Sequence, residues 1–563
     1  MDEDQFTREL RDVLLEGSSN DVPDGLRTRV RAVPDNSARR IGVVAFPRST
    51  RVQQLTAAVA VFGLVVALVI GRSQLISRPT TGVPVASVTD TLPQATAHST
   101  NVDGPLVANR TGHVLIRGAD GTTYVSTAPW DRNSHAKLYA FDANGNLKPG
   151  WPFSPEGVVA FGAPVTGPNG VVYVASWQFG NGSQTTNPAA IWAIASDGSV
   201  QPGWPVPVES PTDPAIGSDG TIYVVSGSAH GQGLLALDAH GGIRPGWPVM
   251  LSGELACGPL NCIPPVPEVG PDGSVYVQIS RGPKAPRYEV AAFRPDGIPV
   301  DGWPVDVPGE GFDVGQNGLL YAWGEVTNGA NPGQAPGLAI VSSVFTVRNP
   351  DGTMHAGWPI SVQGPASPPV LTSDGTLFAV AGGVDGLVGR VIALDSDGTT
   401  PSGWPFEISS DVEVVPSGIA EGNPPRASSP FIGPNALYVP VLRTPDSGSE
   451  GLLALSFDGR LVDGWPVWFA RTRFATLPSS AGDAARIVPA AFDERGNAYV
   501  AITPSDGAAE VVSLGIDGNS RSALRTSNST AVTGVLVDAD GRGFVTELQG
   551  SLTVISFLTL APS

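Results

Sequence analysis

The sequence predicts an all-β protein, a β-propeller of eight or nine four-stranded blades, preceded by one transmembrane α-helix. The tripeptide Gly-Trp-Pro recurs about every 40 to 60 residues, the spacing of propeller blades. Short β-type runs alternate with Asp-Gly turns between the copies, and one uncharged apolar stretch precedes them all. The tryptophans of the seven copies are Trp151, Trp204, Trp247, Trp303, Trp358, Trp404 and Trp465.

Residues 1–51 are predicted to be a cytoplasmic tail with a short helix. Phe6, Leu10, Val13 and Leu14 follow the helical spacing and form one apolar face. A segment of this size does not support a core of its own. Two interpretations stay open: an unstructured tail, or a docking peptide that folds on a partner.

Residues 52–71 are predicted to be a transmembrane helix. No charged residue occurs between Arg51 and Arg72, a window long enough to span a bilayer as a helix. More arginines precede the window than follow it, which places the N-terminus in the cytoplasm and the C-terminal mass outside the cell membrane. A cleaved signal peptide and a buried core helix are the alternatives. The long preceding segment argues against the first, and the lack of a surrounding domain against the second.

Residues 72–104 are rich in Thr, Ser, Pro and Ala without periodicity, and are predicted to form an extended stalk. Residues 105–563 are predicted to be the extracytoplasmic propeller. Each unit has a strand such as 221–226, a variable loop, a second strand such as 234–238, a turn and then Gly-Trp-Pro. Asp-Gly is a favoured two-residue hairpin turn. We therefore expect four antiparallel strands in each blade.

The tripeptide itself predicts a position in the blade. Proline has no N–H for a β-ladder, so it suits the first residue of an edge strand, and the fourth strand of a blade is such an edge. Glycine permits a close backbone approach. Tryptophan buries a large area. We expect the tryptophans to pack between neighbouring blades.

The repeats count to nine units, of which the last is incomplete. It begins at Val535 and ends before a fourth strand, and Pro105-Leu-Val107 could supply the missing edge and close the ring. Propellers usually have about four to eight blades, so eight remains an alternative.

The formal net charge is −19, and the tail and apolar segment contribute none of the acidic excess. Such a surface repels nucleic acid, and no nucleic-acid partner is expected. Much of the acidic excess lies in turn sequences, so turn formation and solubility explain it.

No catalytic, cofactor-binding or metal-binding constellation is recognisable, and no cofactor is expected. The two cysteines, Cys257 and Cys262, are predicted to form a local disulfide outside the membrane, with free thiols as the alternative. Asp142-Ala-Asn-Gly-Asn146 faintly resembles a calcium loop, but lacks the distal Glu and fits a hairpin turn better. Trp177 and Trp323 could line a loop-built binding face or pack in the core.

The phrase Leu138-Tyr-Ala-Phe-Asp142, followed by Gly145 and Trp151, resembles the repeat of pyrroloquinoline-quinone (PQQ)-like propellers. In this family Ala-x-Asp, a glycine turn and a tryptophan recur in each blade. Here the tryptophan comes late and lies in Gly-Trp-Pro. The resemblance implies a propeller, and the family contains both quinone- and calcium-dependent dehydrogenases and non-enzymatic scaffolds. The adjacent cysteines of the enzymes are absent.

These observations favour a membrane-anchored, extracytoplasmic, non-enzymatic binding or scaffold module for a protein or an envelope glycan. One alternative is a transmembrane sensor whose tail docks a regulator, in the manner of membrane-anchored anti-sigma factors. A quinone-dependent dehydrogenase is the second alternative, and fold alone does not decide between them.

Overall fold

The computed structural model describes part of the chain, and the regular secondary structure of that part consists of β-strands. There is no helix among the described residues, and hence none long and apolar enough to cross a membrane. The predicted tail and transmembrane helix lie outside the described residues. The structure describes residues 98–559 except 104–105, 109–112, 128–134, 178–188, 229–230, 252–265, 282–286, 310, 328–339, 383–388, 410, 418–425, 444–448, 470–471, 476–487, 505–508, 526–530, 540–541 and 550–551.

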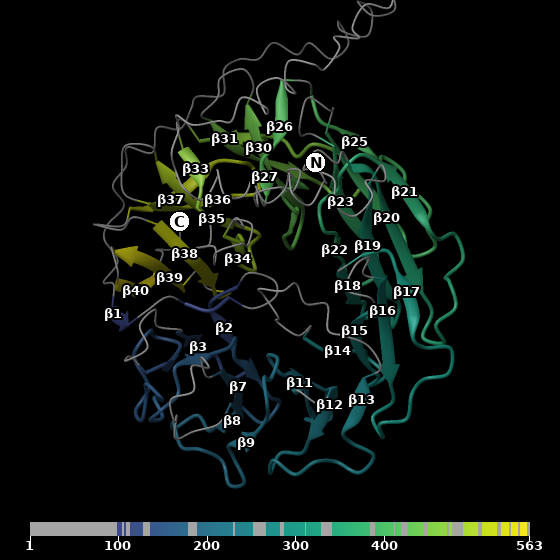
Figure 1. Ribbon diagram of the computed structural model, residues 1–563. Helices are drawn as coiled ribbons and strands as arrows, with labels where there is room; N and C mark the ends of the chain where they lie inside the picture. Colours follow the sequence, from purple (N-terminus) through teal and green to yellow (C-terminus); the bar gives the residue numbers. More distant parts are fainter. Residues whose placement is uncertain are drawn as a thin grey trace, which may run out of the picture. The chain divides into compact units, whose positions relative to one another are not determined.

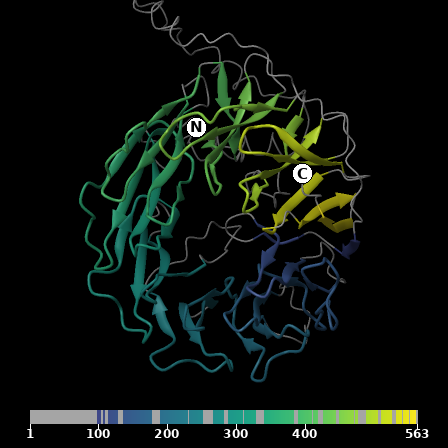
Figure 2. The ribbon, with the colours of Figure 1, turned by 180° about the vertical axis from the view of Figure 1, so that it is seen from behind.

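The strands form nine antiparallel blades that follow one another around a ring (Figures 1 and 2). Blade 1 contains β2 (Ile116–Arg117), β3 (Thr123–Ser126) and β4 (Leu138–Phe141). Blade 2 contains β5 (Ala160–Phe161), β6 (Val165–Thr166), β7 (Val172–Trp177), β8 (Ala190–Ile194) and β9 (Val206–Pro207). Blade 3 contains β10 (Ala215–Ile216), β11 (Ile222–Ser228), β12 (Gly231–Leu237) and β13 (Val249–Leu251). Blade 4 contains β14 (Glu268–Val269), β15 (Val275–Arg281), β16 (Arg287–Phe293) and β17 (Val305–Val307). Blade 5 contains β18 (Gly311–Val314), β19 (Leu320–Thr327), β20 (Ile340–Arg348) and β21 (Ile360–Gln363).

The remaining four blades complete the ring. Blade 6 contains β22 (Val370–Leu371), β23 (Leu377–Ala381), β24 (Arg390–Leu394) and β25 (Phe406–Glu407). Blade 7 contains β26 (Val412–Val414), β29 (Phe431–Ile432), β30 (Leu437–Arg443), β31 (Glu450–Leu455) and β32 (Val467–Trp468), beside a small ribbon of β27 (Pro416–Ser417) and β28 (Arg426–Ala427). Blade 8 contains β33 (Thr472–Phe474), β34 (Ala491–Phe492), β35 (Ala498–Pro504), β36 (Glu510–Leu514) and β37 (Ser520–Arg525). Blade 9 contains β38 (Ala531–Val537), β39 (Arg542–Gln549), β40 (Leu552–Thr559) and β1 (His98–Asp103).

The ring has two different ends, which we call the turn end and the loop end. First strands of neighbouring blades, such as β6, β10 and β14, lie side by side, so the first strand of a blade is innermost. Tight turns join the first strand to the second and the third to the fourth, and both lie at the turn end. The other connections leave the loop end and vary in length: residues 178–189 join β7 to β8, whereas 229–230 join β11 to β12.

Aspartate side chains form the turns at the turn end. In blade 3, Asp219 Oδ1 accepts the backbone N–H of Thr221 at 3.0 Å, and Asp219 Oδ2 accepts its hydroxyl at 2.8 Å. Gly220 between them has φ of 81°, a conformation that costs glycine little. The same bonds recur at the turn of blade 4, from Ser274 to Asp272. This confirms the interpretation that much of the acidic excess serves turn formation.

The seven Gly-Trp-Pro tryptophans join neighbouring blades, as predicted. In each copy the indole N–H donates to a backbone carbonyl in the third-to-fourth-strand turn of the next blade. The fourth strand begins just after the proline, as β13 does after Pro248, and all seven Trp-Pro bonds are cis. The bonds run from Trp151 to Ser196 (3.2 Å), Trp204 to Ala239 (3.1 Å), Trp247 to Pro295 (3.1 Å), Trp303 to Pro350 (2.8 Å), Trp358 to Ser396 (2.7 Å), Trp404 to Phe457 (3.1 Å) and Trp465 to Ile516 (2.8 Å).

The glycine of the tripeptide permits this contact. Gly246 has φ of 88°, and a Cβ built on it would lie 2.0 Å from the carbonyl oxygen of Asp296 in the next blade. A Cβ on Gly297 would in turn lie 2.5 Å from the carbonyl oxygen of Gly246. The two turns therefore touch backbone to backbone, which only glycine at both positions allows.

The ring closes in blade 9, where β1 pairs antiparallel with β40 from His98↔Phe557 to Asp103↔Leu552. The prediction that the N-terminal side supplies the closing strand is correct, and the count is nine blades, one of them split. The prediction that residues 105–107 form this strand is wrong, however, because residues 98–103 form it. Leu106 instead bridges Thr127 at the end of β3, because the backbone of 98–103 already completes the edge of β40.

Candidate functional site

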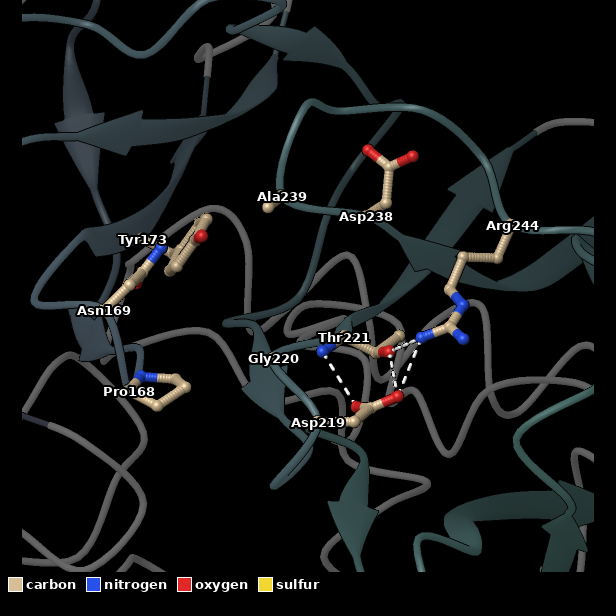
Figure 3. Close-up of a pocket in the computed structure, with 9 residues that line it drawn as sticks. All are labelled: Pro168, Asn169, Tyr173, Asp219, Gly220, Thr221, Asp238, Ala239 and Arg244. Atoms are coloured by element: carbon tan, nitrogen blue, oxygen red, sulfur yellow. Dashed lines mark hydrogen bonds and ion pairs between the residues drawn. The ribbon is translucent and has the colours of Figure 1, made fainter.

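The interface between blades 2 and 3 contains a cavity of about 240 Å³ at the turn end (Figure 3). Blade 2 contributes the turn before β7, and blade 3 contributes both of its turns. The lining residues are Pro168, Asn169, Tyr173, Asp219, Gly220, Thr221, Asp238, Ala239 and Arg244.

An ion pair forms one wall of this cavity. Arg244 Nη1 lies 2.8 Å from Asp219 Oδ2 and also contacts the Thr221 hydroxyl. Partial burial works to raise the pKa of Asp219, but hydrogen bonds from Thr221 and Arg244 outweigh it, and the pKa lies below its usual value. Both side chains remain well exposed, so the pair contributes on the order of 1 kcal/mol or less.

A carboxylate and a phenol complete the polar lining. Asp238 Oδ1 accepts the backbone N–H groups of His240 (2.8 Å) and Gly242 (2.9 Å), and both bonds end on this one oxygen. Tyr173 stands edge-on to Trp204 with ring centroids 5.5 Å apart. Burial raises the pKa of Tyr173, so its hydroxyl keeps its proton at neutral pH.

The corresponding place between blades 5 and 6 is filled. There Asn317 donates to the hydroxyl of Tyr321 at 2.8 Å, and that hydroxyl donates to the carbonyl of Gly375 at 3.0 Å. A Cβ on Gly375 would lie 2.4 Å from the Tyr321 oxygen. The equivalent Gly220 of blade 3 has only the ring of Pro168 nearby, at 3.9 Å. The cavity therefore exists because the blade 2 turn does not reach blade 3.

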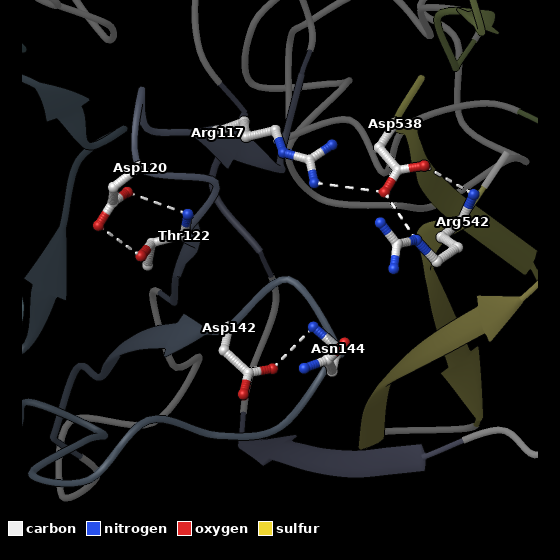
Figure 4. Close-up of polar contacts among 7 residues, drawn as sticks. All are labelled: Arg117, Asp120, Thr122, Asp142, Asn144, Asp538 and Arg542. Atoms are coloured by element: carbon white, nitrogen blue, oxygen red, sulfur yellow. Dashed lines mark hydrogen bonds and ion pairs between the residues drawn. The ribbon is translucent and has the colours of Figure 1, made fainter. Parts of the chain in front are cut away.

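The interface between blades 9 and 1 carries a similar cation with a different neighbour (Figure 4). Lys148 donates to the Thr122 hydroxyl at 2.9 Å and lies 3.9 Å from Asp120, as Arg244 does in blade 3. The preceding turn, however, holds Asp538, which pairs with Arg117 (3.8 Å) and Arg542 (3.2 Å). Charged side chains thus occupy this turn, where blade 2 has Pro168.

The loop end of the blade 2–3 interface holds an unusual carboxyl group, that of Asp213. Asp213 Oδ1 accepts the backbone N–H of Ala163 across the interface at 3.1 Å, and Trp177 donates its indole N–H to the carbonyl of Pro211 at 2.7 Å. A Cβ on Gly162 would lie 2.0 Å from Asp213 Oδ1 and 2.7 Å from the Trp177 ring. Burial raises the pKa of Asp213 to about 7, so this group changes charge near neutral pH.

The sequence identified some of these residues and missed others. Trp177 and Trp323 both pack, partly buried, against the hydrophobic core, Trp177 between blades 2 and 3 and Trp323 between blades 5 and 6, as the core interpretation expected. The hairpin interpretation of Asp142 is confirmed, because its Oδ1 accepts the N–H groups of Asn144 and Asn146. Asp213 was missed, since an isolated Asp before Pro carries no motif. Cys257 and Cys262 lie outside the described residues.

Within the described ranges, no group of three or more His, Cys, Asp or Glu side chains is arranged to hold a metal ion. The acidic side chains are instead distributed singly over the turns. Among the described residues, the polar groups of the blade 2–3 cavity converge on a common space.

No protein-family model and no curated protein sequence match this chain. Several solved propellers are similar in structure. A structure titled as the eukaryotic initiation factor matches with TM-score 0.47 and 10% identity over 76% of this chain and 91% of that one. A europium-containing methanol dehydrogenase matches with TM-score 0.36 and 15% identity, over 80% and 85% of the two chains.

A quinohemoprotein alcohol dehydrogenase from Pseudomonas putida matches with TM-score 0.34 and 14% identity, over 71% of this chain and 75% of that chain. Likeness at this level transfers no activity to this chain.

Proposed function

We propose that this protein is a membrane-anchored, extracytoplasmic binding module that performs no catalysis and binds a protein or an envelope glycan. The observation that carries the proposal is the interface between blades 2 and 3. It has a polar cavity at the turn end and Asp213 beside Trp177 at the loop end. Convergent polar groups in a concave site between rigid elements are typical of binding sites.

The rest of the ring supports such a role by its rigidity. Seven indole-to-carbonyl bonds and paired glycines fix blades 1 to 8 against one another at the turn end. A site formed between two such blades is preorganised, so little ordering entropy is lost on binding. The anchor rests on the uncharged window between Arg51 and Arg72, with the N-terminus in the cytoplasm.

Binding is tested with the full-length protein purified in detergent. We expect saturable binding either to isolated envelope polysaccharide or to one protein recovered by cross-linking on intact cells. Robust turnover of an added alcohol or sugar with a quinone acceptor would contradict the proposal. The absence of saturable binding to both ligand classes would contradict it as well.

The anchor has its own test. Protease added to intact cells should remove the propeller and leave a protected fragment that contains residues 1–51. Protection of the propeller would place it on the other side of the membrane and refute the proposed topology.

A further inference from the structure

We propose that the cavity between blades 2 and 3 binds a single sugar residue of a glycan. This inference rests on the proposed binding function and names its ligand class. It is carried by the chemistry of the lining groups, by the size of the cavity and by the difference between this interface and the one between blades 5 and 6.

The lining offers donors and acceptors together. Arg244 uses Nη1 for Asp219 and Thr221, so its other nitrogens can donate to a ligand. Asp238 uses Oδ1 for the backbone, so Oδ2 can accept. In blade 5 the hydroxyl of Tyr321 donates to a backbone carbonyl of the next blade. The equivalent hydroxyl of Tyr173 faces the cavity instead (Figure 3).

A sugar hydroxyl both donates and accepts, so neighbouring hydroxyls satisfy such a mixed lining. The charges argue against other small ligands. Asp219 and Asp238 outnumber the single guanidinium of Arg244, and this excess of negative charge disfavours phosphate and carboxylate ligands. A polyhydroxylated neutral ring leaves no ligand charge buried.

The size of the cavity selects one ring. A volume of 240 Å³ corresponds to roughly eight water molecules at about 30 Å³ each. Sites for larger ligands occupy roughly 300–1,000 Å³. The exposed ring of Pro168 provides apolar surface for the C–H face of a sugar, while the polar groups of blade 3 lie on the other side (Figure 3).

The chain contains a matched control for this site. Tyr173 and Tyr321 occupy equivalent positions in blades 2 and 5, each beside an asparagine of the same turn. Tyr321 closes its interface by donating to Gly375, whereas Tyr173 lines the cavity. Tyr173→Phe therefore removes a ligand contact, and Tyr321→Phe removes only an internal hydrogen bond.

Saturation-transfer NMR on the full-length protein tests the proposal, with D-glucose, D-mannose, D-galactose and N-acetyl-D-glucosamine as probes. We expect saturation transfer to at least one probe, and added inorganic phosphate should not reduce that signal by competition. Tyr173→Phe should raise the dissociation constant of that probe about five- to tenfold, because about one hydrogen bond to the ligand is lost. Arg244→Met should raise the dissociation constant at least as much, and Tyr321→Phe should leave it unchanged.

Two results overturn the proposal: no transfer to any of the four sugars, or transfer that is equal in the wild-type protein and both cavity variants. If polysaccharide or a protein still binds in the full-length assay, the sugar site falls while the proposed function stands. Melting curves of all three variants establish that each is folded. Loss of binding in Tyr321→Phe to the same extent as in Tyr173→Phe would also refute the assignment.

Discussion

Replacing Asp213 by Asn should stabilise the protein above neutral pH. The folded state raises the pKa of this carboxyl to about 7 by burial, whereas an unfolded Asp titrates near 3.9. Between these values the folded state holds a proton that the unfolded state releases, so the free energy of unfolding falls as the pH rises. Below about pH 4 the group is neutral in both states and costs nothing.

The size of the effect follows from the shift. A difference of about three pH units, at about 1.36 kcal/mol each, sets an upper limit of ~4 kcal/mol. The side chain is only half-buried by its accessible area, which reduces the cost of ionising it, so we expect ~2 kcal/mol at pH 8. Asn keeps an acceptor for the N–H of Ala163 and cannot ionise.

Urea unfolding of both proteins between pH 4 and pH 9 measures this prediction. The advantage of Asp213→Asn should be close to zero at pH 4, grow through pH 7 and level off above it. An advantage that does not change with pH would show that the substitution acts through packing. A wild-type protein that becomes relatively more stable as the pH rises through 7 would reverse the sign and refute the reasoning.

Three further predictions concern the turn end. Trp303→Phe removes the bond to the next blade and leaves a part-buried carbonyl without its donor, so the free energy of unfolding should fall by ~2–3 kcal/mol; a loss below ~0.5 kcal/mol would contradict the role of the indole. Gly246→Ala places a Cβ 2.0 Å from the Asp296 carbonyl oxygen and should cost clearly more than Gly170→Ala, where a Cβ meets nothing within 4 Å and only the ~1–2 kcal/mol of a positive φ remains; equal losses in melting experiments would refute the close approach. The hydroxyl of Thr399 lowers the pKa of Asp397, so Asp397→Asn should lower the melting temperature at pH 7, and this difference should shrink as the pH falls and the carboxylate takes up its proton; persistence of the full difference in acid would contradict the assignment.

The sequence was sufficient for the architecture of the repeat. Alternation of β-type runs with Asp-Gly turns predicts four strands, which blades 3 to 6 and blade 9 have, whereas blade 1 has three and blades 2, 7 and 8 have five. The lack of an N–H on Pro248 explains why the last strand of blade 3 starts immediately after it. The position of Trp247 between blades followed from its size. Its hydrogen bond to the carbonyl of Pro295 did not, since the partner lies in the next repeat and is a backbone group without a sequence signal.

The closing strand shows where such reasoning ends. His98–Asp103 reads His-Ser-Thr-Asn-Val-Asp, without apolar alternation, and was therefore assigned to the stalk. It forms a strand because β40 offers an unpaired edge, and among residues 99–102, whose burial is described, only Val102 is fully buried. The segment forms a strand because it pairs with a distant edge, although its own β-propensity is low. This pairing is a tertiary effect, so no local sequence pattern predicts it.

The cavity was unpredictable for a related reason. Tyr173 and Tyr321 follow nearly identical turns in the sequence, one with Asn169 and the other with Asn317. Whether such a tyrosine closes its interface depends on how closely the next blade approaches. That distance is set by the packing of two complete blades, so it becomes visible only in the structure.

The two interfaces of blade 9 explain how a ring with only seven tripeptides can stay closed. Seven copies join blades 1 to 8, so the contacts of blade 9 with blade 8 and with blade 1 have no indole bond of this kind. The hydrophobic cluster that spans them takes over, and in it the ring of Phe544 in blade 9 lies against that of Phe141 in blade 1, with centroids 5.7 Å apart. Phe557 lies against Gly145, where a Cβ would come within 2.2 Å of its ring.

This arrangement separates two means of joining blades. The tripeptide fixes a blade through directed bonds at the turn end, whereas blade 9 relies on apolar burial and on the strand pairing of β1 with β40. Since burial tolerates small displacements better than a directed hydrogen bond does, we infer that blade 9 is the place where the ring opens first on unfolding. Hydrogen exchange of the β1 amides should then be faster than that of β12 in the middle of blade 3, and equal protection of the two strands would contradict this order.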